Sequence, residues 1–237
     1  MHTRLKKVWS ISLSLLAFIV GGCVSGIDEE DPIESGLRYF PMEVGKYNTY
    51  DVLVIDYALD GNNDTTRYQL KEQYVGTFNN LSGQLAYFLH RFKRTTMHQD
   101  WELDSVMSAY IDNNRVIVNE NSLLTIKMMV PVGNDVSWDA NLLNGRNAEI
   151  HTMRSVGQPF TLENVNTMAS TLQVVESEEI DNLLLKDHRF RFYAENVGLI
   201  LQESVTLQYC SDSDCIGDFI IEGGRLYKKT ILEYGVE

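Results

Sequence analysis

The sequence lacks every short motif that commonly marks a catalytic or nucleotide-binding site. It contains no Gly-x-Ser-x-Gly nucleophile elbow, no His-Glu-x-x-His zinc motif, no Gly-x-Gly-x-x-Gly and no phosphate-binding loop. Carboxylates are plentiful, but the sequence singles out no pair of them for acid–base chemistry. These absences predict a protein that is not an enzyme and that uses no cofactor.

Cysteine is also scarce, with three residues in the chain. Cys210 and Cys215 enclose the short segment Ser211–Asp214, and in an oxidising compartment such a pair favours a disulfide at a hairpin tip. Half of a zinc site is the alternative. It would need further ligands, but the sequence has no second cysteine pair, and the nearest histidine along the chain is His188. We therefore expect a disulfide and no metal site.

Basic residues are few, with 20 Lys and Arg against 33 Asp and Glu and a formal charge of −13. Three of the basic residues and none of the acidic ones precede residue 23. The rest of the chain therefore has 17 Lys and Arg against 33 Asp and Glu, a formal charge of −16. A chain this acidic is unsuited to broad electrostatic contact with nucleic acid. Anionic lipid head groups would repel it as well, so membrane attachment requires another device.

The longest apolar run, residues 8–20, is too short to cross a bilayer, which takes about 20 apolar residues. It follows the basic residues Arg4, Lys6 and Lys7 and ends at Gly21 and Gly22. A positive segment, an apolar segment and small residues in this order are typical of an export signal. We assign residues 1–22 to a signal peptide.

The end of this signal, Val20-Gly21-Gly22-Cys23, resembles the lipobox of bacterial lipoproteins. The resemblance implies cleavage before Cys23 and modification of its thiol with diacylglycerol and palmitate. A simple signal peptide that happens to contain a cysteine is the alternative. Several acyl chains, each buried methylene contributing about 0.8 kcal/mol, would anchor the protein permanently.

Residues 23–36 form the next segment, which carries four consecutive acids at 28–31. Its composition indicates a solvated, flexible tether. Val24 stands where an Asp tends to retain Gram-negative lipoproteins in the inner membrane, so the resemblance implies the outer membrane. The acidic run also resembles a surface-export signal, and both the cell surface and the periplasmic face remain open.

Residues 37–237 read as short alternating segments separated by turns. This pattern predicts an all-β fold, a mostly antiparallel β-sandwich, barrel or strongly curved sheet of roughly a dozen short strands with at most one or two short helices. We expect a single domain, or two similar halves near 37–130 and 131–237, because a Pro, a Val-Gly and an aromatic recur in both.

Three local expectations concern individual segments. Strand 101–112 should turn Leu103 and Met107 inward and Asp104 outward. The best helix candidate is 178–186, on the spacing of its apolar residues. Segments 219–222 and 226–234 should be two strands joined by a Gly223-Gly224 hairpin turn.

The basic run of residues 90–94 is dense for so acidic a chain. If its strand pairs with strand 101–112, cross-strand ion pairs are the simpler interpretation. The alternative is a small anion-binding site, in which arginines from two hairpins would converge without acidic neighbours. The candidate residues are Arg91, Arg94, Arg189 and Arg191.

Two phrases, residues 39–50 (YFPMEVGKYNTY) and residues 192–200 (FYAENVGLI), resemble the opening and a late hairpin of a loose group of uncharacterised secreted and lipid-anchored Gram-negative β-rich proteins. The resemblance implies no catalytic residues.

Three functional hypotheses follow from the sequence. The first is a lipid-anchored, non-catalytic β domain that binds an envelope protein or a glycan. The second is a lipocalin-like carrier of a small apolar ligand, which requires an apolar cavity of several hundred Å³. The third is a hydrolase with an unrecognised site, which requires a cleft containing a nucleophile or carboxylate pair with a perturbed pKa.

Overall fold

A computed structural model describes residues 31–163 and 167–237. This part of the chain forms a nearly closed, barrel-shaped antiparallel sheet, and the all-β prediction is confirmed. The elements are α1 (Pro32–Leu37), β1 (Lys46–Tyr57), β2 (Asp64–Asn79), β3 (Leu85–Arg94), β4 (Glu102–Asp112), β5 (Arg115–Glu120), β6 (Leu123–Met129), β7 (Ser137–Asp139), β8 (Ile150–Phe160), β9 (Met168–Asp181), β10 (Leu185–Ala194), β11 (Gly198–Tyr209) and β12 (Ile221–Val236).

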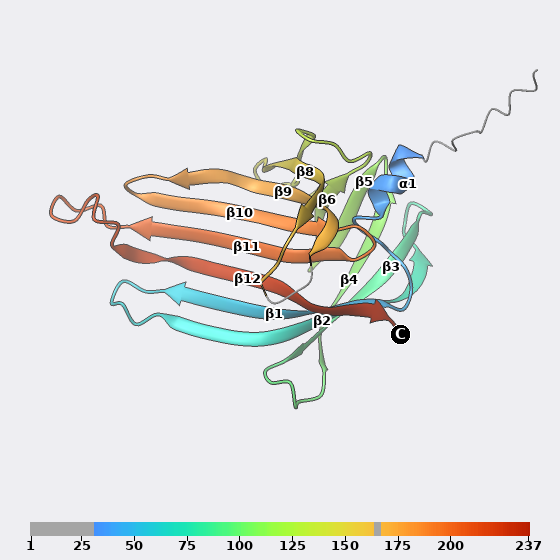
Figure 1. Cartoon of the computed structure of the whole chain (residues 1–237), viewed down its shortest axis with the longest axis horizontal. Helices are drawn as coiled ribbons and strands as arrows, with labels where there is room; N and C mark the ends of the chain where they lie inside the picture. Colours follow the sequence, from blue (N-terminus) through green and yellow to red (C-terminus); the bar gives the residue numbers. More distant parts are fainter. Residues whose placement is uncertain (1–30, 164–166) are drawn as a thin grey trace, which may run out of the picture.

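The twelve strands lie in the order β6-β5-β4-β3-β2-β1-β12-β11-β10-β9-β8-β7. Nearly every strand pairs with its neighbour in sequence, as expected where short turns join antiparallel strands. The exception is β1, which pairs with β12 and so brings the two ends of the sheet-forming chain together (Figure 1). Each half of the chain therefore contributes six adjoining strands, and the sheet edges lie at β6 and β7.

Contacts between β6 and the segment around β7 bring these two edges together. The backbone N–H of Ile126 donates to the carbonyl of Ala140 at 3.0 Å. The indole Nε1 of Trp138 donates to the carbonyl of Ile126 at 2.9 Å. The side-chain amide of Asn144 donates to the carbonyl of Leu124 at 2.9 Å. These bonds satisfy edge groups that would otherwise be exposed for pairing with another chain.

Helix α1 lies in part of the segment that the sequence assigns to a flexible tether. Asp31 caps it, its Oδ1 accepting from the N–H of Ile33 at 2.9 Å, and Pro32 occupies the first turn. A Cβ on Gly36 would lie 3.1 Å from Cγ1 of Val130, so a larger residue would require Val130 to shift and glycine favours this close contact. Residues 32–36 are thus ordered against the sheet, whereas Cys23 and the acids at 28–30 lie outside the described residues.

No helix within 31–163 and 167–237 combines the length and the apolar character that crossing a membrane requires.

The predicted helix over residues 178–186 is wrong. Strand β9 continues to Asp181, and β10 begins at Leu185. The carboxamide of Asn182 accepts from the N–H groups of Leu184 and Leu185, both at 2.9 Å, and so builds the tight turn between the strands. A side chain that bonds its own backbone in this way favours a turn over a helix.

The predicted hairpin turn at Gly223-Gly224 is also wrong, because β12 runs through both residues. Gly224 has φ +128°, and a Cβ there would lie 2.2 Å from the carbonyl oxygen of Thr206 on β11. The glycine permits close approach of two paired strands rather than a reversal of the chain.

Strand β4 does not keep the alternation that its sequence suggests. A bulge places Asp104 out of register, since Ser105 pairs with Arg91 and Leu103 pairs with Phe92. Met107 remains buried, but Leu103 is 56% exposed and Asp104 lines the interior. One extra residue in a strand reverses the facing of all residues beyond it.

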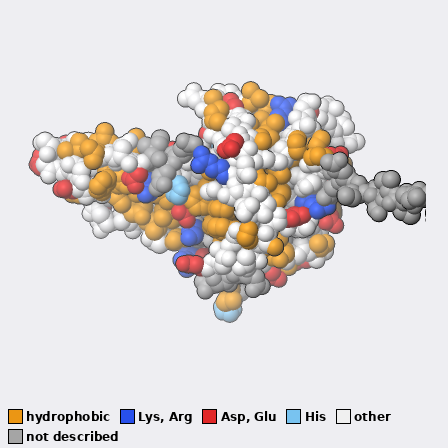
Figure 2. All heavy atoms as spheres, turned by 45° about the horizontal axis from the view of Figure 1, so that its top comes forward, with side chains coloured by type: hydrophobic (Ala, Val, Ile, Leu, Met, Phe, Trp, Pro, Cys, Tyr) orange, Lys and Arg blue, Asp and Glu red, His pale blue; other side chains and the backbone are white. Residues whose placement is uncertain are grey.

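Six long strands, β1, β2 and β9–β12, extend beyond the barrel-shaped part as an elongated end (Figure 1). Its loops include a disulfide between Cys210 and Cys215, whose Cα atoms are 5.9 Å apart. Figure 2 shows apolar side chains on the surface of this end. Val52 and Val54 of β1 are nevertheless buried: they pair with Lys229 and Tyr227 of β12 and so face inward, and they belong to one apolar cluster with Leu162 and Met168 from the β8–β9 connection.

Replacing Trp138 by Phe should destabilise the protein, because the carbonyl of Ile126 then loses a buried donor. We expect a loss of about 2 kcal/mol in the free energy of unfolding, measured with urea. Trp101→Phe is the control. Trp101 contacts the guanidinium of Arg94 at 4.1 Å at the surface, so its loss should cost below about 1 kcal/mol. Equal losses for the two variants would contradict the role of Trp138 in closing the sheet.

Candidate functional site

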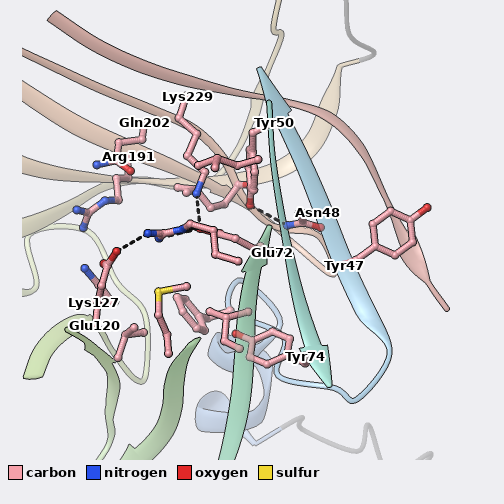
Figure 3. Close-up of a pocket in the computed structure, with 18 of the residues that line it drawn as sticks. Tyr47, Asn48, Tyr50, Glu72, Tyr74, Glu120, Lys127, Arg191, Gln202 and Lys229 are labelled. Atoms are coloured by element: carbon pink, nitrogen blue, oxygen red, sulfur yellow. Dashed lines mark hydrogen bonds and ion pairs between the residues drawn. The ribbon is translucent and has the colours of Figure 1, made fainter. Parts of the chain in front are cut away.

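The barrel-shaped part of the sheet encloses a cavity of about 410 Å³. Nine strands, β1–β6 and β10–β12, contribute side chains to its wall, together with Phe40 and Pro41 after α1. Figure 3 shows most of these side chains pointing toward one another from facing strands, with Tyr47 directed away from the others. The volume suits a small organic molecule.

A second cavity of about 500 Å³ adjoins the first, and four residues line both: Glu120, Lys127, Arg191 and Gln202. Together the two cavities are lined by eight basic and five acidic residues, an excess of positive charge inside a strongly acidic protein. They are Lys46, Arg91, Lys93, Lys127, Arg146, Arg189, Arg191 and Lys229, against Glu72, Asp104, Glu120, Glu149 and Glu176.

Glu72 on β2 is the centre of the charged network. Its carboxylate accepts from Lys229 of β12 at 2.8 Å and from Arg91 of β3 at 3.0 Å. Burial opposes ionisation of Glu72, but the charges of Lys229 and Arg91 prevail and lower its pKa to about 2. The same ammonium of Lys229 lies 4.0 Å from the ring centroid of Tyr50. Three strands are thereby tied together by one carboxylate.

Two further ion pairs extend the network across the cavity. Arg91 also reaches Glu120 on β5 at 2.5 Å, and Arg191 on β10 pairs with Glu176 on β9 at 2.6 Å. Burial alone would lower the pKa of Arg91, but Glu72 and Glu120 raise it. Each of these carboxylates therefore has a cationic partner, as buried charges require.

Lys127 on β6 is different, because its ammonium makes no ion pair or hydrogen bond with any described residue. Burial first, and the nearby guanidinium of Arg191 second, lower the pKa of Lys127 to about 8. Figure 3 shows Lys127, Arg191 and Gln202 on the same side of the cavity. Lys127 therefore lies beside a second cation and pairs directly with none of the described carboxylates, although Glu120, Glu176 and Glu72 are near enough to oppose the lowering of its pKa.

Tyrosines supply much of the remaining wall. Tyr50, Tyr74 and Tyr193 lie on three different strands, and burial raises the pKa of each, to about 12 for Tyr193. The hydroxyl of Tyr50 donates to the carbonyl of Leu199 at 3.1 Å. Rings of this kind offer an apolar face and a neutral polar tip to a ligand.

Besides Arg191 and Glu176, which pair with each other, two cavity-lining side chains have buried polar atoms without a hydrogen-bond partner in the described part of the chain. They are Oδ1 of Asn48 in the first cavity and both ring nitrogens of His151 in the second. His151 Nε2 lies 3.8 Å from Glu149, whose pKa is lowered to about 2 by His151 and Arg189. Buried polar groups are nearly always satisfied, so such exceptions are typical of functional sites.

The four predicted anion-site arginines do not form a site free of carboxylates. Arg91 and Arg191 line the first cavity, but Glu72, Glu120 and Glu176 pair with them. The physical reason is that a buried guanidinium needs a counter-charge.

The other two arginines lie elsewhere. Arg189 pairs with Asp187 at 2.7 Å and with Glu149, in the second cavity. Arg94 lines neither cavity and instead bonds Gln69 at 2.8 Å. The acids of β4 expected to pair with the basic run form no ion pair with it in the described residues.

Sequence reasoning missed Glu72, Glu120, Lys127, Glu176 and Lys229. A signal for them exists: each charged residue shares a strand face with apolar or aromatic residues that should point inward. In β2, Tyr68, Leu70, Glu72 and Tyr74 alternate on one face. A charged residue on the strand face that otherwise carries apolar residues indicates that the interior of the sheet is polar. It does not mean that the strand register was assigned wrongly.

No group of three or more His, Cys, Asp or Glu side chains converges as a cation site within residues 31–163 and 167–237.

No protein-family profile matches the chain, and no curated protein matches it. Two solved structures superimpose on most of it. One is a predicted lipoprotein from Parabacteroides distasonis ATCC 8503, whose sequence is 11% identical to this one. The two structures superimpose with a TM-score of 0.40, and the match covers 83% of this chain and 98% of the lipoprotein chain. The other, a predicted exported protein with a YmcC-like fold from Bacteroides fragilis NCTC 9343, shares 11% identity with a TM-score of 0.41, covering 82% and 97%. Likeness at this level carries no inference about function.

Replacing Glu72 by Gln should destabilise the protein by about 3 kcal/mol, because Lys229 and Arg91 lose their shared counter-charge. The folded-state pKa of Glu72 is lowered, so its contribution is present above the unfolded-state value of about 4.3 and is lost as the pH falls toward 2. Urea unfolding at several pH values should therefore show the two proteins converging in acid.

Glu203→Gln is the matched control. Glu203 pairs with Lys228 at 3.6 Å, one residue along each strand from the cavity-lining Gln202 and Lys229 and thus on the opposite sheet face. This variant should lose below about 1 kcal/mol. A Glu72→Gln protein as stable as the control at neutral pH would contradict the central role of Glu72.

Proposed function

We propose that this chain is a lipid-anchored, non-catalytic envelope protein that binds a small ligand inside its sheet. The observation that carries the ligand half of the proposal is the interior cavity, which keeps Glu176 and Lys229 buried and Lys127 partly buried, the last without an ion-pair partner among the described residues. Burying charge costs free energy unless the charge has a partner. A fold that served only as a scaffold would be more stable with an apolar interior.

The cavity favours a ligand with both an apolar and a polar part. Its volume of about 410 Å³ falls in the range that the lipocalin-like hypothesis requires, but its wall is not apolar. Besides tyrosines and aliphatic residues, it contains the Glu72–Lys229–Arg91 network. A purely apolar ligand would desolvate these groups without compensation, so we favour an amphipathic one.

A hydrolase is less well supported. The carboxylates Glu72 and Glu149 have pKa values of about 2, far below the range in which a general acid or base works near neutral pH. Both are engaged by basic side chains. The site is therefore better suited to recognising a ligand than to transforming one.

In the anchor half of the proposal, Cys23 is the first residue of the mature protein. Its lipid anchors the protein in the outer membrane. Its support is the lipobox-like sequence Val20-Gly21-Gly22-Cys23 and the basic and apolar segments before it. An envelope protein or glycan in contact with the exposed body would be compatible with a ligand inside it.

Replacing Cys23 by Ser should abolish lipidation and release the protein from membranes. Metabolic labelling with palmitate should mark the wild-type protein and leave the variant unlabelled. The variant should move to the soluble fraction, because the remaining strongly acidic chain does not bind anionic lipid by charge. A labelled variant, or one that stays with the membrane, would refute the anchor.

Ligand binding is tested by native mass spectrometry of the full chain released from lipid nanodiscs. We expect a fraction of molecules to carry one small organic adduct when the protein is purified from its own envelope. Unfolding the protein in acid should release the adduct. Uniformly adduct-free protein that also binds no member of a library of small amphipathic compounds would contradict the proposal.

A further inference from the structure

We propose that the ligand of the cavity is a small organic carboxylate, whose carboxylate group binds between Lys127 and Arg191 while its apolar body fills the tyrosine-lined part. The inference rests on the proposed ligand-binding function and specifies the chemistry of that ligand.

The charge balance of the buried part of the site favours a monoanion. Four cations, on β3, β6, β10 and β12, face three carboxylates, on β2, β5 and β9. Since each carboxylate is already paired, one positive charge is left over, and it belongs to Lys127. A ligand with one negative charge would neutralise the interior, whereas a neutral one would leave the ammonium unpaired.

The position of Lys127 fits this role. It lines both cavities, as do Arg191 and Gln202. The amide of Gln202 makes no hydrogen bond with a described side chain or backbone group, so it is available as a further donor. Figure 3 shows the three polar groups directed to one side of the cavity. Arg191 keeps Glu176 as a partner at 2.6 Å, so the incoming carboxylate would complete the environment of Lys127 in particular.

The rest of the first cavity fits an apolar or aromatic body. Its wall there combines tyrosine rings with apolar side chains, which exclude water from the ion pair and so strengthen it. These apolar residues are Phe40, Leu70, Leu89, Met107, Val118 and Leu199.

The test compares two ligands that differ in charge and hardly in shape, 1-naphthaleneacetate and 1-naphthaleneacetamide. Binding to the full chain in lipid nanodiscs is measured by calorimetry, with empty nanodiscs as the baseline. We expect the acid to bind about tenfold more tightly than the amide or better, as a charge-assisted bond to a desolvated ammonium implies. Lys127→Met should remove this preference while leaving amide binding within about twofold.

Two further variants separate charge from folding. Lys127→Arg should retain the preference for the acid, because the cation is kept. Lys228→Met, which removes a lysine on the opposite face of β12, should behave as the wild-type protein. Thermal unfolding confirms that each variant is folded before binding is measured.

The pH dependence gives an independent readout. The charged groups around Lys127 are Arg191 on β10, Glu120 on β5, Glu176 on β9 and Glu72 on β2. Carboxylates and guanidinium groups keep their charge between pH 7 and about 9.5. Acid binding should therefore weaken over this range as Lys127 loses its proton, while amide binding stays constant.

The outcomes distinguish this inference from the proposed function. Equal binding of acid and amide, or a preference that survives in Lys127→Met, would overturn the carboxylate site and leave a ligand-binding cavity. Failure of both ligands to bind the folded wild-type protein would overturn the carboxylate inference, and the native mass spectra would then decide whether the cavity function fails with it.

Discussion

A carboxylate held between two cations inside the sheet is the interaction on which this structure depends. Glu72 joins β2 to β3 through Arg91 and to β12 through Lys229, and Arg91 continues the network to Glu120 on β5. The interior of the barrel-shaped part is therefore polar, and the apolar core divides into separate clusters. A single apolar core would leave these charges unsatisfied.

The fold class follows from the sequence because alternation and turn chemistry are local. The run from Lys46 to Tyr57 is apolar on both faces, and it lies at the centre of the sheet, between β2 and β12. The errors arose where contacts distant in sequence decide the structure. Gly223-Gly224 has the composition of a turn. The two glycines nevertheless lie within β12, where Gly224 allows the close approach of Thr206 on β11. The bulge at Asp104 likewise depends on the register with β3.

The candidate site was predictable in part. Arg91 and Arg191 were recognised as unusual, and both line the cavity. Their carboxylate partners were not foreseen, because the sequence does not give the register between strands: Glu72 lies directly opposite Arg91 in the β2–β3 pair, and Glu120 lies on β5, two strands from β3. Lys127 stands between the buried Ile126 and Met128, which pair with the consecutive residues Ile117 and Val116 of β5. Lys127 is therefore the extra residue of a bulge, and strand alternation alone could not place its side chain.

The proposed ligand site depends on the partly buried ammonium of Lys127, which lies next to Arg191 and forms no ion pair with the residues that the structure describes. Its most direct test is reductive methylation of the protein with ¹³C-formaldehyde, followed by NMR titration of the dimethyl-lysine signals, with the Lys127 signal assigned by its absence in Lys127→Met. Lys127 should titrate near pH 8, well below the exposed lysines. A Lys127 signal that titrates with the exposed lysines, near the ordinary value of about 10.4, would contradict it.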